Sequence, residues 1–310
     1  MGVDEGPSSP DVAARRGDVA FWAPHLDEIL GRHRLSGAGR APVAGFNPTH
    51  PTFVCGDVVV KLFGSRPAWR VSHAAERAAL VRLAADLSIP APRLLAEGCL
   101  RDDPDAPWPY LVTSRVPGTS WREASLSARH RRAVAEELGD AVRRLHALPP
   151  SGVAAEGDWA PPDVAAAASR SSLPPHLVAQ AGAFVARLPP ADRVFVHGDL
   201  VAAHVFVEGG RLAGVIDWGD AMATDRHYEL IQLQRDLFDG DRTLLRAFLD
   251  AGAWPMGEDL PHLALGHGLR RQALGLAQHG TMDVFEPVAA RLPLHEIRTL
   301  EELATAMFAV

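Results

Sequence analysis

The sequence predicts an α+β fold with two lobes, a small strand-rich lobe followed by a larger, mostly helical lobe. Short β-prone runs separated by Gly and Pro concentrate before Ser114, whereas helical periods dominate after Gly118. The pair Pro117–Gly118 breaks regular structure and would form part of the hinge between the lobes. The expected parts are a tail over residues 1–19, an N-terminal lobe over 20–116 and a C-terminal lobe over 117–310, with a cleft between the lobes.

The elements of the first lobe are bounded by Gly and Pro. We expect an amphipathic helix over Phe21–Arg34 and a loop over Gly45–Pro51. A second helix is expected over Ser72–Leu87, because Pro90 and Pro92 prevent its continuation. The expected strands are Val58–Phe63, Arg93–Ala96 and Tyr110–Ser114.

The second lobe is predicted from helical periods and one hairpin. Ala128–Leu148 places its apolar residues on one helical face. Residues 149–175 are rich in Pro, Ala and Ser and are expected to form a loop with one short helix, and the chain from Tyr228 onward is expected to be mostly helical. The expected strands are Val194–Val196, Val205–Val207 and Leu212–Ile216, the last two forming a hairpin.

Composition and charge exclude several classes of protein. With a net charge of −7, the chain lacks the basic surface that nucleic-acid-binding proteins need. Two cysteines, Cys55 and Cys99, are too few for a disulfide framework, so we expect a cytoplasmic protein with free thiols. No apolar run approaches the roughly 18 residues needed to span a bilayer. We therefore expect no nucleic-acid or membrane partner, and a monomer or weak dimer.

Lys61 is the only lysine of the chain and lies within the apolar run Val58–Phe63. A lysine ammonium is a compact point charge, which suits contact with the phosphates of a nucleotide, and the forked guanidinium of arginine does not replace it. The alternative is a lysine that protects an edge strand from pairing with another chain. We interpret Lys61 as a phosphate contact.

Glu76 provides the expected counter-charge. On the predicted helix it shares the apolar face with Leu80 and Leu83, where a carboxylate requires a cation. A Lys–Glu pair that directs the lysine at the α- and β-phosphates is how kinases build this half of the site. The alternative is that Glu76 only lies at the boundary of the apolar face.

The strongest motif is VHGDLVAAH over Val196–His204, followed by GVIDWGD over Gly214–Asp220. Asp199 and Asp217 each follow an apolar strand, which places both carboxylates in a cleft. There one carboxylate can accept the proton of a hydroxyl group, and the other can hold Mg²⁺ against a nucleotide. A single aspartate after a strand often only caps a turn. Two of them, with a hairpin between and Lys61 upstream, indicate a phosphoryl-transfer site.

These residues resemble the aminoglycoside phosphotransferases, a family with a protein-kinase-like fold. The resemblance rests on HGDLVAAH, GVIDWGD, Lys61 and the hinge YLVTSRVPGTSW, and it extends from about Phe21 to the C-terminus. The runs VKLFG, WPYLV and FVHGDL are especially similar to the hygromycin B 7″-O-kinase branch. The resemblance implies a small N-lobe with an antiparallel sheet and one main helix, and a larger, mostly helical C-lobe.

The resemblance also implies a role for each matching residue. Asp199 would be the catalytic base or the carboxylate that orients the acceptor hydroxyl, and Asp217 would bind Mg²⁺. Lys61, paired with Glu76, would contact the α- and β-phosphates of ATP or GTP. The loop Gly45–Thr52 would cover the phosphates, and the hinge would bind the nucleobase. The residues expected for these last contacts are Thr49 in the loop, and Arg115 (carbonyl) and Val116 (N–H) in the hinge.

His204 departs from the family pattern, which has Asn at this position as an oxygen ligand for a second Mg²⁺. Imidazole binds Mg²⁺ poorly and Mn²⁺ or Zn²⁺ well, so His204 could coordinate through nitrogen, act through water, or leave one metal site weak. A nucleotide-binding pseudokinase with weak catalysis is therefore an alternative. A zinc protein using His197 and His204 is another, although a finger-like partner pair is missing from the sequence.

The acceptor is the least determined part of the prediction. Leu260–Met282 contains no acid but carries His267, Arg270 and Arg271 within one helical turn. A cationic wall formed by these residues would favour an anionic or neutral sugar, whereas the alternative is that the arginines face solvent or pair with acids. A polycationic aminoglycoside would need carboxylates. The helical half does contain acids, namely Asp220, Asp225, Glu229, Asp236 and Asp239, of which Asp220 follows the second motif directly.

The predicted function is transfer of the γ-phosphoryl group of ATP or GTP, with Mg²⁺, to a hydroxyl group of an antibiotic, which would confer resistance. The antibiotic would be an aminoglycoside such as hygromycin B or a sugar-bearing nucleoside of the capuramycin type. A metabolic kinase acting on choline, homoserine or a sugar is the alternative within the same fold.

Overall fold

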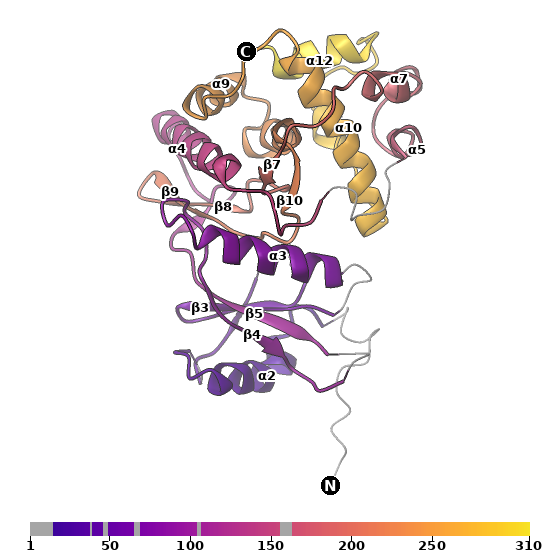
Figure 1. The fold of residues 1–310 in the computed structure, drawn as a ribbon. Helices are drawn as coiled ribbons and strands as arrows, with labels where there is room; N and C mark the ends of the chain where they lie inside the picture. Colours follow the sequence, from indigo (N-terminus) through magenta and orange to yellow (C-terminus); the bar gives the residue numbers. More distant parts are fainter. Residues whose placement is uncertain (1–14, 38, 46–48, 65–68, 104–106, 156–162) are drawn as a thin grey trace.

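The computed structural model describes residues 15–37, 39–45, 49–64, 69–103, 107–155 and 163–310. Figure 1 shows a small lobe built around a sheet and a larger lobe of helices, which confirms the predicted α+β fold. Of the expected tail, residues 1–14 lie outside the described residues, and residues 15–17 form a turn that precedes helix α2 (Val19–Arg32). No helix in the described part of the chain is both long and apolar enough to cross a membrane.

A five-stranded antiparallel sheet forms the small lobe, in the order β1-β2-β3-β5-β4. The strands are β1 (Val43–Ala44), β2 (Thr52–Cys55), β3 (Val58–Leu62), β4 (Leu94–Cys99) and β5 (Pro109–Ser114). The register pairs Lys61 of β3 with Thr52 on one side and Leu111 on the other. Because side chains alternate along a strand, Lys61 projects to the face opposite Val60 and Leu62.

Two helices cover the two faces of this sheet (Figure 1). Helix α2 packs Trp22 and Leu26 against the face that carries Val60 and Leu62. Helix α3 (Trp69–Leu83) covers the other face and joins the main core through its apolar residues. This helix ends before the expected position, because Asp86 accepts hydrogen bonds from Ser88 in a side-chain turn. Lys61 therefore emerges on the α3 face.

The large lobe is mainly helical, as predicted. Its longer helices are α4 (Ala128–Ala147), α9 (Arg242–Ala251), α10 (Leu260–His279) and α12 (Leu300–Phe308), and its shorter ones are α5 (Val164–Ala168), α6 (Pro175–Val178), α7 (Ala181–Val185) and α11 (Glu286–Ala289). Side-chain caps fix where several of them begin, for example Ser127 at α4 and Asp241 at α9. The core that these helices enclose continues into the small lobe through Phe63 and Leu111.

Two small sheets of the large lobe carry the sequence motifs. Strands β8 (Val205–Glu208) and β9 (Arg211–Val215) form the predicted hairpin, with β6 (Thr119–Ser120) at its edge. Strand β7 (Arg193–Val196) pairs with β10 (Met222–Asp225), which the sequence analysis did not predict. Strand β10 is buried along its whole length, so no polar–apolar alternation marks it.

The chain after β10 folds back toward the motifs in three short turns of helix. These are the 3₁₀ turn η2 (Arg226–Glu229), the single turn α8 (Leu230–Gln232) and the π-helical turn η3 (Leu233–Leu237). π-Helical turns are rare and occur often at functional sites.

Candidate active site

Lys61 lies at the centre of an ion-pair network on the α3 face of the sheet. Its Nζ donates to Oε2 of Glu76 at 2.6 Å and to Oδ1 of Asp217 at 2.8 Å. Glu76 comes from α3, where it is 6% exposed, and Asp217 comes from the large lobe just after β9. Asp217 adopts a left-handed backbone conformation with φ of 62°, which aspartate tolerates better than most residues. The network therefore joins the two lobes.

The charges of Lys61 and Asp217 stabilise each other, whereas burial disfavours the charge of Glu76. Burial lowers the pKa of Lys61, but the carboxylates of Asp217 and Glu76 outweigh burial and raise it above its ordinary value. Burial raises the pKa of Asp217, but Lys61 and His204 outweigh burial and hold it well below its ordinary value. At Glu76 burial dominates, and the pKa is raised. Lys61 is thus an ammonium and Asp217 a carboxylate at neutral pH, as contact with phosphates and a metal ion requires.

The loop after β7 is held by Glu229. Its Oε1 accepts a hydrogen bond from the N–H of His197 at 2.6 Å, and its Oε2 accepts one from the N–H of Gly198 at 3.2 Å. Burial raises the pKa of Glu229 to about 7, although these two N–H groups favour the carboxylate. Glu229 is fully buried, so it is not part of the open acidic surface for a polycation that the sequence analysis considered. Its structural role is to fix the backbone that carries Asp199.

Asp199 ends this loop with its side chain 21% exposed. Its Oδ1 accepts hydrogen bonds from Nη2 of Arg271, at 3.1 Å, and from Nε2 of Gln232. Burial raises the pKa of Asp199, but Arg271 and His204 outweigh burial and lower it. No sequence motif marks Gln232, because its contact arises only when η2 and α8 fold back onto the loop.

His204 lies between Asp199 and Asp217. Its Nδ1 is 2.9 Å from the main-chain carbonyl oxygen of Asp199, and its Nε2 is 3.5 Å from Oδ2 of Asp217. Because a carbonyl can only accept, Nδ1 carries a proton and Nε2 is the nitrogen that faces Asp217. Burial lowers the pKa of His204, but the charges of Asp217 and Asp199 outweigh burial and raise it.

The donor set of His204 and Asp217 is one nitrogen and one carboxylate. A nitrogen–oxygen pair suits Mn²⁺ better than Mg²⁺, which prefers oxygen ligands. In the described residues no group of three or more His, Cys, Asp or Glu side chains could hold a metal ion. Phosphate oxygens and water would therefore complete the coordination, and the described residues do not support a structural zinc site.

The hinge joins β5 to β6. The N–H of Arg115 donates to the carbonyl of Asp57 at 2.9 Å, whereas no hydrogen bond within the described residues engages the Arg115 carbonyl or the Val116 N–H. Both groups can therefore serve a nucleobase. Val116 packs against Gly214 of β9, where an added Cβ would lie 2.8 Å from its side chain. A side chain at position 214 would therefore press on Val116 of the hinge, so glycine is favoured at this position.

The expected phosphate loop is described only in part, because residues 46–48 lie outside the described residues. Thr49 is exposed, and its carbonyl accepts a hydrogen bond from Arg16. The next residue, His50, is buried against Phe63 with ring centroids 4.8 Å apart. Since Thr52 pairs with Lys61, Thr49 lies at the Lys61 end of the sheet.

The cationic wall expected within Leu260–Met282 does not form. His267 is 1% exposed, and burial lowers its pKa to about 4, so it is neutral at pH 7. Arg271 is also 1% exposed, and its charge is paired with Asp199 and Asp220. Of the three predicted residues only Arg270 is partly exposed. The charges of a helix do not show which of its faces is buried.

The acids expected around a polycationic acceptor have partners inside the protein. The partners are Arg271 for Asp220, His227 for Asp225, the loop N–H groups for Glu229, Arg122 and the N–H of Ala202 for Asp236, and Arg291 for Asp239. Four of these carboxylates are mostly buried, whereas Asp239 is 81% exposed, so the five do not together form the open acidic surface that the sequence analysis considered.

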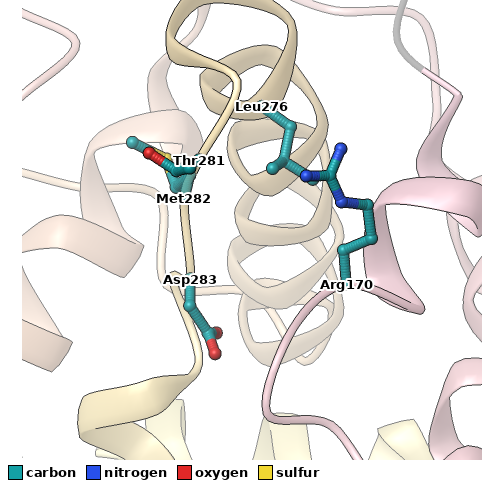
Figure 2. Close-up of a pocket in the computed structure, with 5 residues that line it drawn as sticks. All are labelled: Arg170, Leu276, Thr281, Met282 and Asp283. Carbon is teal, nitrogen blue, oxygen red and sulfur yellow. The ribbon is translucent and has the colours of Figure 1, made fainter.

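A surface pocket lies at the C-terminal end of α10, apart from the residues of the candidate active site. Its lining residues are Arg170, Leu276, Thr281, Met282 and Asp283. Figure 2 shows Arg170 beside Leu276, with the other three on the opposite side. Nη2 of Arg170 donates to the carbonyl of Gly280 at 3.1 Å, so part of its hydrogen-bonding capacity is used within the protein. None of the predicted site residues lines this pocket.

Buried histidines predict a loss of stability in acid. Burial lowers the pKa of His146 to about 3 and those of His197 and His267 to about 4. Below about pH 6.5 the unfolded chain binds protons that the native protein does not, so the free energy of unfolding falls as pH falls, by up to about 1.4 kcal/mol per pH unit for each histidine.

Urea titrations of the wild type and His267→Gln at pH 6.5 and 5.5 test this prediction. We expect the variant to lose about 1 kcal/mol less than the wild type over this interval. The raised pKa values of Glu229 and Glu76 act in the opposite direction in both proteins, so they cancel in the comparison. Equal losses in the two proteins would show that His267 is protonated in the native state.

The fold and the site together define a class of protein. A lysine on the small-lobe sheet is paired with a helix glutamate and with Asp217 of the large lobe, and His204 lies between Asp217 and Asp199. This arrangement is that of the protein-kinase-like phosphotransferases.

The chain belongs to the phosphotransferase enzyme family (APH), whose family model matches residues 50–264. An aminoglycoside 3′-phosphotransferase of Streptomyces fradiae is 32% identical over an alignment of 167 positions, which covers 48% of this chain and 59% of that protein. This chain therefore spans about three fifths of the length of that relative.

Solved structures share the fold. An aminoglycoside phosphotransferase, APH(3″)-Id from Streptomyces rimosus, superposes with a TM-score of 0.57 at 22% identity, over 83% of this chain and 99% of that one. A macrolide 2′-phosphotransferase from Brachybacterium faecium superposes with a TM-score of 0.57 at 21% identity, over 92% of this chain and 97% of that one. The GDP complex of an aminoglycoside 2′-phosphotransferase-IIIa superposes with a TM-score of 0.65 at 15% identity, over 93% of this chain and 99% of that one. The family and fold inferred from the motifs are confirmed.

Proposed function

We propose that this protein transfers the γ-phosphoryl group of ATP or GTP to a hydroxyl group of a small-molecule antibiotic and so confers resistance. The observation that carries the proposal is the network of Lys61, Glu76 and Asp217, which continues through His204 to Asp199. It combines a cation for phosphates, a carboxylate for a metal ion and a carboxylate for a hydroxyl group. These are the parts that phosphoryl transfer requires.

Each residue has a distinct role in this proposal. Lys61, held by Glu76, contacts the α- and β-phosphates, and Asp217 with His204 holds the metal ion. When bound, the metal ion neutralises phosphate charge. Asp199 accepts a hydrogen bond from the acceptor hydroxyl and directs its oxygen at the γ-phosphorus. Because the pKa of Asp199 is lowered, this carboxylate acts more by orientation than by early removal of the proton.

The nucleotide binds between the lobes in this proposal. The carbonyl of Arg115 and the N–H of Val116 bind the edge of the base, and the loop that includes Thr49 covers the phosphates. Related structures contain ADP or GDP, which supports a nucleotide donor without deciding between ATP and GTP for this chain. We expect a cytoplasmic protein that acts as a monomer or weak dimer.

The acceptor is proposed from the relatives and from the charges of the large lobe. One related structure contains streptomycin, another contains kanamycin, and a third protein is a macrolide 2′-phosphotransferase. Hygromycin B-like compounds and nucleosides of the capuramycin type extend this set. Since Asp220, Asp225 and Glu229 are mostly buried and paired within the protein, acceptors with few amino groups are the first candidates to test.

An acceptor panel tests the proposed function. Purified protein is incubated with ATP or GTP and Mg²⁺ or Mn²⁺, and each antibiotic is examined by mass spectrometry for one added phosphoryl group. We expect a singly phosphorylated product from at least one sugar-bearing antibiotic, and a higher inhibitory concentration for bacteria that express the protein. Nucleotide binding without any product would favour a pseudokinase instead.

His204 predicts a metal preference. We expect the complex with a non-hydrolysable nucleotide to bind Mn²⁺ in preference to Mg²⁺, because imidazole nitrogen favours Mn²⁺. In His204→Asn an amide oxygen replaces the nitrogen, and the ratio of the two dissociation constants should move toward Mg²⁺ by about tenfold, or about 1.4 kcal/mol. Calorimetric titration with each metal checks this directly. An unchanged ratio would mean that His204 does not coordinate the metal.

A further inference from the structure

Arg271 is a fully buried guanidinium in the middle of α10. Its Nη2 donates to Oδ1 of Asp199 at 3.1 Å and to Oδ2 of Asp220 at 3.0 Å. The guanidinium also lies over the ring of Tyr228, 5.9 Å from its centroid. Burying a guanidinium is unfavourable unless its charge is compensated, and here two carboxylates compensate it. Arg271 thus connects α10 to Asp199.

The two carboxylate oxygens of Asp199 have different surroundings. Oδ1 receives hydrogen bonds from both Arg271 and Gln232. Oδ2 lies 3.4 Å from Nδ1 of His204, whose shorter contact is with the Asp199 main-chain carbonyl at 2.9 Å. The lone pairs of Oδ1 are therefore directed at fixed donors, whereas Oδ2 keeps capacity for a further donor.

Gln232 is itself held in one orientation. Its Oε1 accepts a hydrogen bond from Nε of Arg235, which belongs to the π-helical turn η3. Because Oε1 is the acceptor in that contact, Nε2 must be the atom that faces Asp199. The amide therefore donates to Oδ1 and cannot rotate without losing two hydrogen bonds.

We infer that Arg271 and Gln232 are positioning residues that hold Oδ1 of Asp199, so that Oδ2 alone receives the acceptor hydroxyl. This inference rests on the proposed phosphotransferase function. It replaces the direct acceptor contact that the sequence analysis expected of Arg271, because that side chain is 1% exposed. A carboxylate held at one oxygen has one productive orientation, and a small misplacement of such a group can cost about 100-fold in rate.

The alternative role for Arg271 is purely structural, as the counter-charge of Asp220. The two roles predict the same change in stability but a different kcat when the charges of Arg271 and Asp220 are both removed. In Arg271→Gln alone, Asp199 and Asp220 lose their shared cation, so the variant is expected to be destabilised under either role. In the double variant Arg271→Gln/Asp220→Asn the uncompensated charge of Asp220 is gone, and the melting temperature should recover in part under either role.

Steady-state kinetics of the double variant separate the roles. If Arg271 positions Asp199, kcat stays about 100-fold below wild type, and KM for the nucleotide stays within about twofold. Gln232→Met, which removes the amide without changing charge, should lower kcat in the same way. A double variant that regains wild-type kcat would overturn the inference. The matched control is Arg246→Gln/Asp250→Asn, which removes an exposed Arg–Asp pair on α9 and should leave kcat and KM unchanged.

Crystal structures of the double variant keep the inference separate from the proposed function. A turned or poorly ordered Asp199 carboxylate supports positioning, and an Asp199 that keeps its wild-type contacts overturns it. If the wild type phosphorylates no acceptor of the panel, the proposed function fails, and these structures still decide whether Arg271 and Gln232 hold Asp199.

Discussion

Asp199→Asn is expected to reduce phosphoryl transfer by about 10³-fold while nucleotide binding survives. Asparagine preserves the shape of the side chain, and its oxygen can still accept hydrogen bonds from Arg271 and Gln232. The amide NH₂ then takes the place of Oδ2, where it can donate to the acceptor hydroxyl but cannot accept from it. The enzyme should therefore fold and bind nucleotide but lose the group that orients the acceptor.

The measurement is kcat by product mass spectrometry, together with the nucleotide dissociation constant by calorimetry. The control is Asp192→Asn, which changes an aspartate that is 77% exposed and paired with Arg226 on the surface. This control should keep both values within about twofold, because exposed ion pairs contribute little. Turnover near the wild-type rate in Asp199→Asn would remove Asp199 from the mechanism and the proposed function with it.

The ion-pair network around Lys61 could be predicted because its signals are local. Lys61 is a charge within an apolar strand, and strand alternation directs it to one face. Glu76 interrupts the apolar face of a helix, so a cation had to lie opposite. Asp199 and Asp217 lie in motifs that end strands, and the strands β7 and β9 bring them to one region. In each case a short stretch of sequence contains the reason for the contact.

The supports of Asp199 could not be predicted, because their contacts depend on the tertiary fold. Glu229, Gln232 and Arg271 meet the loop only after η2, α8 and α10 pack around it. The acid-free stretch of α10 indicated a cationic surface, but packing buried Arg271 and neutral His267. Strand β10 was missed for a related reason, since a fully buried strand of four residues has no alternation to detect.

Gly198→Ala is expected to disrupt the loop after β7 that carries Asp199. Gly198 has a φ of 85°, in the region that favours glycine, and an added Cβ would lie 2.3 Å from the main-chain oxygen of Asp220. Alanine would therefore add a backbone clash to conformational strain, and the loop would have to move away from the segment that carries Asp217 and Asp220. We expect kcat to fall by about 100-fold or more and the free energy of unfolding to fall by about 3 kcal/mol.

Gly209→Ala separates the clash from the strain. Gly209, at the turn of the β8–β9 hairpin, has a φ of 58°, but an added Cβ would meet no atom within 4 Å. This variant should cost only the strain, about 1 kcal/mol, and leave kcat unchanged. Urea denaturation and the transfer assay on both variants measure the difference. If Gly198→Ala costs no more than Gly209→Ala and keeps its activity, the loop is not held by its close approach to Asp220, and the Glu229 hydrogen bonds to His197 and Gly198 must fix Asp199 on their own.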